Sequence, residues 1–241
     1  MTAGPKSALV LFSGGQDSAV CLAWALRRFA DVRTVGFDYG QRHAAELTAR
    51  FAVRQSIATS FPSWASGLGD DRVFDLHSFG AIGESALTGE RPIEIRDDGL
   101  PTTFVPGRNL VFLTYAAAVA EHGRLDVLVG GMGEADYSGY PDCRRATLDA
   151  LETTLALGMG RDFPIMTPLM RLNKAQTWAL AKGLGGERLV EIIVEDSHTC
   201  YRDSRATAHP WGRGCGECPA CLLRAKGFAD WVSAGRPALD P

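Results

Sequence analysis

The sequence predicts an α/β fold, an open doubly wound parallel sheet, followed by a small helical module that binds a metal. The first 57 residues alternate short apolar runs with segments of helical spacing, which is the β-α-β-α order of a sheet with helices on both faces. Four of the six cysteines crowd into Cys200–Cys221, which favours a metal site. We therefore expect one domain over residues 1–195 and a four-cysteine module over residues 196–241.

The opening elements follow from local hydrophobic patterns. Ser7–Phe12 is a short apolar run typical of a buried parallel strand, and Val32–Phe37 is a second strand candidate. Asp17–Phe29 and His43–Ile57 place their apolar residues at roughly helical spacing. These four segments form the first two β-α units.

The middle of the chain mixes loops with regular elements. Residues 60–106 are rich in Gly, Pro and Asp, so we expect long loops with short pieces of structure, among them one strand at Arg72–Leu76. Leu110–Ala120 predicts a buried helix, and a further strand begins over Asp126–Val129. Gly130–Arg144 is then a loop at the carboxyl end of that strand.

The remainder of the chain is expected to be helical on either side of a cysteine-rich stretch. The last helix closes the cysteine module. Helices are expected at Arg145–Leu157, at Asn173–Leu184, over a short Glu187–Val194 and at about Cys221–Trp231.

The composition is that of an ordinary globular protein, with 46% hydrophobic and 22% charged residues. The net charge is −3 and the 25 Lys and Arg are scattered, which argues against a basic nucleic-acid surface. No apolar run approaches the ~18 residues of a spanning helix, and Met1–Lys6 lacks the order of a signal peptide. We therefore expect a cytoplasmic protein with no membrane or nucleic-acid partner.

A glycine pair directly after the first strand carries the first functional signal. Residues 13–18 read SGGQDS and lead into a helix. Glycines let the backbone approach a ligand closely, and the first N–H groups of the helix favour an anion. The Ser13 and Ser18 hydroxyls are suited to donate to phosphate oxygens, and Asp17 to cap the helix or hold a magnesium ion. No Gly-Lys-Ser/Thr of a Walker A motif follows, and no dinucleotide GxGxxG is present at this turn.

The SGGQDS loop resembles that of the PP-loop ATP pyrophosphatases, which cleave ATP to AMP and pyrophosphate. Four further blocks resemble one family of that superfamily, the 7-cyano-7-deazaguanine synthase (QueC) family. The likeness runs from Val10 to about Phe228 and weakens only over residues 60–95. The blocks read FDYGQRH at 37–43, FVPGRN at 104–109, DYSGYPDCR at 136–144, and CGECPAC at 215–221 with Cys200 upstream.

This resemblance implies a ligase that forms C–N bonds and consumes ATP. It implies that 7-carboxy-7-deazaguanine and ammonia become the nitrile 7-cyano-7-deazaguanine, a precursor of queuosine and archaeosine. The expected intermediates are an adenylated carboxylate and an amide, and AMP and pyrophosphate leave. The implied cofactors are ATP, Mg²⁺ and one structural Zn²⁺ per chain, and relatives suggest a homodimer.

The resemblance also carries a nucleotide site over to this chain. The site covers the loop, the residue before it and the start of the helix, although Cys21 itself reads as a core residue. The expected nucleotide-binding residues are Phe12, Ser13, Gly14, Gly15, Gln16, Asp17, Ser18, Ala19, Val20, Cys21 and Leu22.

Three residues are expected to serve catalysis, namely Asp17, Arg108 and Lys174. The two cations, together with Arg42, are suited to neutralise charge on pyrophosphate or to take the substrate carboxylate. A solvated surface position is the alternative for any single Arg or Lys.

The loop at 136–144 is expected to bind the deazapurine, because it follows a strand at the edge where open α/β sheets bind ligands. Its carboxylates are suited to accept from the guanine-like N–H edge, and its tyrosines to stack on the ring. The composition also suits an ordinary turn. Cys143 has no identifiable base partner, which favours an inert or substrate-lining role over a covalent one. The expected substrate contacts are Tyr39, Arg42, Asp136, Tyr137, Tyr140 and Asp142.

The cysteine module has the spacing C-x14-C-x2-C-x2-C, formed by Cys200, Cys215, Cys218 and Cys221. Four thiolates satisfy tetrahedral zinc and leave no open position, so a structural site is expected. An iron–sulfur cluster is the alternative, but the further cysteine followed by proline in bacterial ferredoxins is absent here. The flanking His198 and His209 are weaker ligand candidates.

Two other functions remain open at this point. One is a tRNA-modifying PP-loop enzyme that activates a base and delivers sulfur, against which the acidic net charge counts. The other is a nucleotide-binding or zinc-scaffold protein without catalysis, which would not require all the substrate-like blocks.

Overall fold

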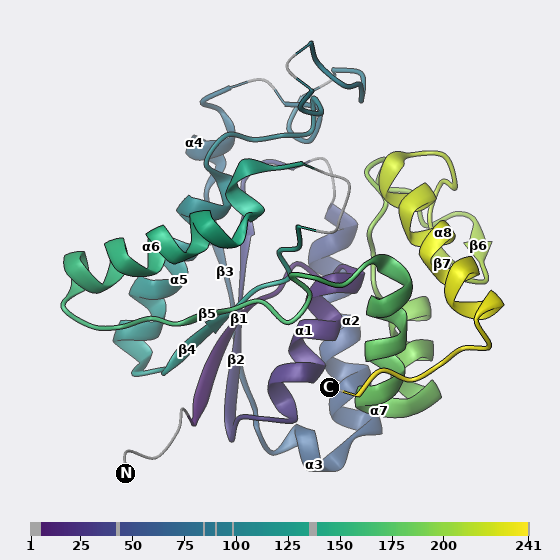
Figure 1. Ribbon diagram of the computed structural model, residues 1–241, viewed down its shortest axis with the longest axis horizontal. Coiled ribbons are helices and arrows are strands. Elements are labelled where there is room, and N and C mark those ends of the chain that lie inside the picture. The colour runs from purple at the N-terminus through teal and green to yellow at the C-terminus, as the bar shows by residue number, and fades with distance from the viewer. Residues whose placement is uncertain are drawn as a thin grey trace.

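The computed structural model describes residues 6–41, 44–83, 85–89, 91–97, 99–134 and 139–240, without the side chains of Ala44 and Leu47. Its centre is a five-stranded parallel sheet with the strand order β3-β2-β1-β4-β5 (Figure 1). The strands are β1 (Ser7–Leu11), β2 (Asp31–Asp38), β3 (Leu68–Asp75), β4 (Val127–Val129) and β5 (Ile165–Met166). The chain winds from β1 toward one edge and then returns to the other side of β1. The point where the order reverses therefore lies between β1 and β4.

Alternate residues of β1 enter two separate cores, as a parallel strand covered on both faces requires. Ala8 and Val10 are fully buried on one face, and Leu9 is buried on the other. The strand is apolar from Ala8 to Leu11 because neither face is left to solvent. This is the physical reason that the Ser7–Phe12 pattern predicted it correctly.

Helices cover both faces of the sheet. Figure 1 shows α5 and α6 on one side, and α1, α2 and α7 on the other with α8 beyond them. The two hydrophobic cores divide in the same way. The bounds are α1 (Gln16–Leu26), α2 (Ala44–Ser60), α5 (Arg108–Gly123), α6 (Arg145–Met159), α7 (Lys174–Asp196) and α8 (Pro219–Ser233). The predicted open parallel α/β fold is confirmed.

The segment 60–106 contains short pieces of structure joined by loops, as expected. The single predicted strand is β3, which begins four residues earlier than Arg72 and pairs along β2. Two short helices, α3 (Pro62–Ala65) and α4 (His77–Gly80), flank it. Asp and Gly interrupt the apolar pattern of an exposed edge strand, so periodicity underestimates its length.

Two glycines divide α7 where the sequence predicts two helices. Gly185 and Gly186 have non-helical backbone angles, and Gly186 has a φ of +64°. A glycine adopts that conformation without the cost that a side chain would impose. The predicted helices Asn173–Leu184 and Glu187–Val194 therefore correspond to the two halves of one kinked element.

The cysteine-rich tail packs against the main body through α8. Trp231 stacks on Trp178 of α7 with ring centroids 6.2 Å apart, and Phe228 meets the same ring edge-on at 5.2 Å. A small hairpin of β6 (Ala208–His209) and β7 (Gly212–Arg213) precedes α8. The proposed boundary between residues 195 and 196 stays a prediction. Among the described residues, no helix is both long and apolar enough to cross a membrane.

Candidate active site

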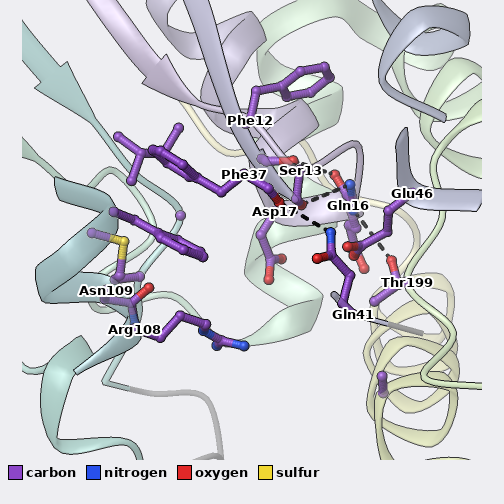
Figure 2. Close-up of a pocket in the computed structure, with 18 of the residues that line it drawn as sticks. Phe12, Ser13, Gln16, Asp17, Phe37, Gln41, Glu46, Arg108, Asn109 and Thr199 are labelled. Atoms are coloured by element: carbon purple, nitrogen blue, oxygen red, sulfur yellow. Dashed lines mark hydrogen bonds between the residues drawn. The ribbon is translucent and has the colours of Figure 1, made fainter. Parts of the chain in front are cut away.

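A cavity of about 330 Å³ lies at the carboxyl ends of β1 and β4 (Figure 2). It lies where the strand order reverses, the place at which open α/β sheets bind ligands. Gly131, which follows β4, lies close to the first turn of α1, the helix that follows β1. A Cβ on this glycine would lie 3.3 Å from the Cβ of Asp17.

The SGGQDS loop at residues 13–18, called the phosphate loop below, forms one wall of the cavity, and its backbone packs against α2. Gly14 has a φ of +93°, and a Cβ there would lie 2.7 Å from the Glu46 carbonyl oxygen. Only glycine fits both the conformation and the space. Gly15 is the N-cap of α1 and offers no side chain to the first helical N–H groups, which leaves that end of the helix open to an anion.

Two hydroxyls fix the shape of this loop. Ser13 Oγ accepts from the Gly15 N–H at 3.2 Å. Ser18 Oγ accepts from the Gly14 N–H at 3.2 Å and donates to the Gly15 carbonyl at 3.1 Å. Both serines line the cavity, so they hold the turn and also face a ligand.

An ion pair lies beside the loop. Lys174 Nζ donates to Asp17 Oδ2 at 2.7 Å, although the two residues are 157 positions apart. Lys174 opens α7, whose start is fixed by a capping box between Asn173 and Gln176. The other oxygen, Asp17 Oδ1, is buried and has no hydrogen-bond partner among the described residues. A cation or a donor from a ligand would satisfy it.

On the opposite wall of the cavity, aromatic side chains surround the guanidinium of Arg108. Arg108, in the first turn of α5, donates from Nη1 to the Tyr39 hydroxyl at 3.3 Å. Its guanidinium lies 5.9 Å from the Tyr39 ring centroid and 5.8 Å from that of Tyr140. Figure 2 shows Arg108 reaching from the start of α5 toward the phosphate loop. The chamber is suited to a flat ring that carries a negative charge.

The four cysteines of the tail meet at one point. The sulfurs of Cys200, Cys215, Cys218 and Cys221 all lie within 4.8 Å of one another, and those of Cys215 and Cys221 are 3.9 Å apart. A tetrahedral zinc with Zn–S bonds of ~2.3 Å needs sulfurs about 3.8 Å apart. The cluster therefore fits a four-thiolate metal site.

Neither flanking histidine joins this cluster of candidate ligands. His198 is fully buried, with Nε2 lying 3.5 Å from Asp203 Oδ1. His209 stacks on Trp211 at 4.5 Å, and its Nε2 lies 3.3 Å from the Gly214 carbonyl oxygen.

Comparison with known proteins agrees with this geometry. The model of the family described as "Queuosine biosynthesis protein QueC" matches residues 7–232. The chain belongs to the QueC family. It is 65% identical over 97% of both chains to the 7-cyano-7-deazaguanine synthase of Caulobacter vibrioides strain NA1000 / CB15N. It is 63% identical to that of Maricaulis maris strain MCS10, over 95% of this chain and 94% of the relative.

A solved structure agrees on the fold. It is the crystal structure of a 4-thiouridine synthetase–RNA complex with bound ATP, matched with a TM-score of 0.50 and 15% identity. The match covers 93% of this chain and about half, 53%, of that one. At this identity the likeness concerns the fold alone.

The expected nucleotide-binding residues of this QueC-family chain divide into two groups. Phe12, Ser13, Gly15, Gln16, Asp17 and Ser18 line the cavity. The side chains of Ala19, Val20, Cys21 and Leu22 are fully buried in the core between α1 and its neighbours, as expected for Cys21. The second group supports the helix rather than facing the cavity.

The expected substrate contacts are only partly brought together. Tyr39 and Tyr140 line the cavity with Arg108, whereas Asp142 does not. Asp142 is buried, and its Oδ2 accepts from the Asn109 N–H at 3.0 Å, so it caps α5 from another segment. Its contact with substrate stays a prediction, and Arg42, Asp136 and Tyr137 lie outside the described residues.

Cys143 lines the cavity and accepts a hydrogen bond from Asn109 Nδ2 at 3.3 Å. The sequence places Asn109 beside Arg108 but does not reveal this contact. Asn109 therefore links the start of α5 to the loop that precedes α6.

Sequence reasoning missed Glu46, Thr199 and Arg224, all of which line the cavity. Burial raises the pKa of Glu46 to about 7, with Arg108 opposing that shift and Asp203 adding to it. Arg224 is buried in α8, and desolvation lowers its pKa to about 10, so it remains charged at neutral pH. Glu46 lies three residues after the block at 37–43 that resembles the QueC family. The sequence offered no other signal that it belongs to the site.

Proposed function

We propose that the protein converts 7-carboxy-7-deazaguanine and ammonia into 7-cyano-7-deazaguanine, and that ATP is cleaved to AMP and pyrophosphate. The product is a precursor for queuosine and archaeosine synthesis. The observation that carries the proposal is one cavity that joins a phosphate loop to a cationic aromatic chamber, in a chain of the QueC family. Relatives more than 60% identical over nearly the whole length bear the name of this synthase.

The reaction requires an oxygen of the substrate to be activated by adenylation in two successive rounds. A carboxylate is a poor electrophile, so its oxygen attacks the α-phosphate of ATP, pyrophosphate leaves, and an acyl adenylate forms. Ammonia adds to the carbonyl carbon, AMP leaves with the oxygen, and a proton is lost to give the amide. The amide oxygen then attacks the α-phosphate of a second ATP, pyrophosphate leaves, and loss of AMP and of both N–H protons gives the nitrile. Two ATP are consumed per nitrile.

The loop at residues 13–18 is assigned to the phosphates of both ATP molecules. Asp17 is assigned to a magnesium ion, which would neutralise phosphate charge, because Asp17 Oδ1 has no partner among the described residues. Lys174 is held within 2.7 Å of Asp17 and is suited to stabilise the charge that develops on pyrophosphate.

The chamber formed by Arg108, Tyr39 and Tyr140 is assigned to the deazaguanine. The tyrosine rings give apolar faces for the base, and the guanidinium can pair with the carboxylate and hold it toward the loop. Tyr39 follows the end of β2 and Arg108 lies at the start of α5, so these two groups come from fixed points. The orientation of the reacting carboxylate would then be set before ATP reacts.

The four-cysteine cluster is assigned to one structural zinc ion, which would fix the loop-rich tail. The fit of the sulfur spacing to a tetrahedral ion supports this assignment. Elemental analysis tests it, because iron with a visible absorption band would instead indicate an iron–sulfur cluster.

The activity is tested by incubating the protein with ATP, Mg²⁺, an ammonium salt and 7-carboxy-7-deazaguanine. We expect nitrile together with two AMP and two pyrophosphate for each nitrile formed. AMP that forms only in the presence of tRNA would refute the proposal. Arg108→Ala should lower kcat/KM for the base by about tenfold to a hundredfold, as expected for a lost charged contact. Arg188→Ala, an exposed cation on α7, is the matched control and should leave kcat/KM unchanged.

We also propose that the chain divides into a main domain (residues 1–195) and a zinc module (residues 196–241), and that it forms a homodimer. Light scattering during size-exclusion chromatography would measure the mass of the assembly. Limited proteolysis would show whether the chain is cut near residue 196.

A further inference from the structure

Thr199 joins the tail to the phosphate loop. It lies between the end of α7 and the first metal-site cysteine, and it lines the cavity. Its Oγ1 accepts from the Gln16 N–H at 3.4 Å, across 183 positions of sequence, and from Arg224 Nη1 at 3.0 Å. Figure 2 shows Thr199 beside Gln16, with the first of these bonds dashed.

The hydrogen-bonding capacity of this hydroxyl is only partly used. A threonine hydroxyl has two lone pairs that accept and one hydrogen that donates. Gln16 and Arg224 occupy both lone pairs, and no acceptor for the hydrogen is found in the part of the chain that the structure describes. Because the residue faces the cavity, that hydrogen remains for a ligand.

The ligand group at this position should be an anion. Thr199 lies against the first turn of α1, where the helix dipole and the Ser13–Ser18 loop favour negative charge. We propose that Thr199 donates a hydrogen bond to a phosphate oxygen of ATP, so that the tail supplies a second wall of the nucleotide site. This inference rests on ATP being the nucleotide of the proposed function.

Arg224 is the positioning residue for this contact. Its guanidinium is 1% exposed, and besides Thr199 it donates to the Trp211 carbonyl at 2.9 Å and to the Ile193 carbonyl at 2.8 Å. Three acceptors on a planar fork leave it little freedom to move. A charged donor on Oγ1 also polarises the hydroxyl and strengthens its own donation.

Thr199 and Arg224 flank the four-cysteine cluster in the sequence. Thr199 directly precedes Cys200, and Arg224 follows Cys221 by three positions on α8. The neighbouring His198 N–H donates to the Gly14 carbonyl at 3.0 Å, which adds a second link to the loop. The tail is therefore tied to the nucleotide loop at two successive residues, next to a cysteine of the cluster.

A purely structural role for Thr199 makes the opposite prediction. If the hydroxyl only satisfied the Gln16 N–H, its removal would free that donor for phosphate. ATP affinity would then stay the same or rise, while the protein lost stability.

Calorimetric titration of MgATP without the deazaguanine substrate separates the two roles. Thr199→Val removes the hydroxyl at constant shape and should weaken ATP binding by about tenfold to a hundredfold, as expected for a hydrogen bond to a charged group. Thr199→Ser keeps the hydroxyl and should bind within about threefold of wild type. Ser197→Ala is the control, because it removes a buried hydroxyl of the same segment whose one bond among the described residues goes to the Ile193 carbonyl. Its ATP affinity should not change.

Adenosine serves as the probe of site integrity, because it carries no phosphate and should bind Thr199→Val as it binds wild type. Thr199→Ala replaces the valine variant if the latter does not fold. Arg224→Lys should weaken ATP binding in wild type but add little in the Thr199→Val background, since both act through one hydroxyl.

ATP affinity of Thr199→Val within threefold of wild type would overturn the inference. If the losses of ATP affinity caused by Thr199→Val and Arg224→Lys add fully in the double variant, the positioning role of Arg224 is overturned. A wild-type protein that binds no ATP would instead refute the proposed function, so the two failures are distinguishable.

Discussion

Replacing Gly14 with alanine tests how closely α2 packs against the phosphate loop. Gly14 has a φ of +93°, a region that side chains disfavour. The new Cβ would also lie 2.7 Å from the Glu46 carbonyl oxygen and 2.8 Å from the Arg50 nitrogen. Both neighbours are backbone atoms of one helix, so neither can rotate away.

The expected loss has two parts. The positive φ costs about 1–2 kcal/mol for a residue with a Cβ. The close contact with α2 adds about 1–3 kcal/mol, the usual cost of overpacking a site that cannot relax freely. We therefore expect Gly14→Ala to lower the free energy of unfolding by about 2–5 kcal/mol.

Gly160→Ala is the matched control. Gly160 ends α6 with a φ of +69°, and a Cβ there would meet nothing within 4 Å. Gly160→Ala therefore incurs only the cost of the positive φ. The difference in the free energy of unfolding between the two variants then measures the contact with α2. Equilibrium urea unfolding, followed through the five tryptophans, measures both. If the two variants are equally stable within about 0.5 kcal/mol, the overpacking argument based on that contact fails.

Three further outcomes are expected. Asp17→Asn should abolish AMP formation without changing the metal content, which rapid-quench assays and elemental analysis would show; wild-type activity would remove Asp17 from the site. Cys215→Ser should release the metal, and full retention of zinc would contradict the four-thiolate site. Burial raises the pKa of Glu46 from 4.5 to about 7, so between these values the folded state holds a proton that the unfolded chain releases. Stability therefore falls as pH rises through that window, and Glu46→Gln should raise Tm more at pH 8 than at pH 5 in scanning fluorimetry, whereas a larger gain at pH 5 would reverse the sign.

The phosphate loop could be predicted because its signal is contiguous. Six neighbouring residues set the turn, the helix start and the hydroxyls, and the structure brings Ser13 and Ser18 to one cavity wall. Part of the cysteine cluster has an equally local signal, because spacings of two residues bring the sulfurs of Cys215, Cys218 and Cys221 together. Cys200 joins them from 15 positions upstream, and the spacing alone indicated it.

The remaining parts of the site depend on contacts that no local pattern encodes. Nothing in the sequence indicated that Oδ2 of Asp142, expected on the substrate, accepts from the N–H of Asn109, 33 positions away. The two-residue strand β5 was not predicted, because it is too short to establish a period. Thr199 and Arg224 have ordinary neighbours in sequence and gain their importance only where α7 and α8 meet the loop.

The two rounds of adenylation place a demand on this arrangement. Between the rounds AMP and pyrophosphate must leave and a second ATP must enter, while the amide has to stay near the same α-phosphate position. The residues assigned to the base, Arg108 and Tyr39, belong to α5 and the end of β2. Those assigned to the phosphates belong to the loop and the tail, where Thr199 lies beside Gln16. Because different elements carry the two sets, an exchange of nucleotide at the loop would not require the residues assigned to the base to move, which is consistent with one loop serving both proposed reactions.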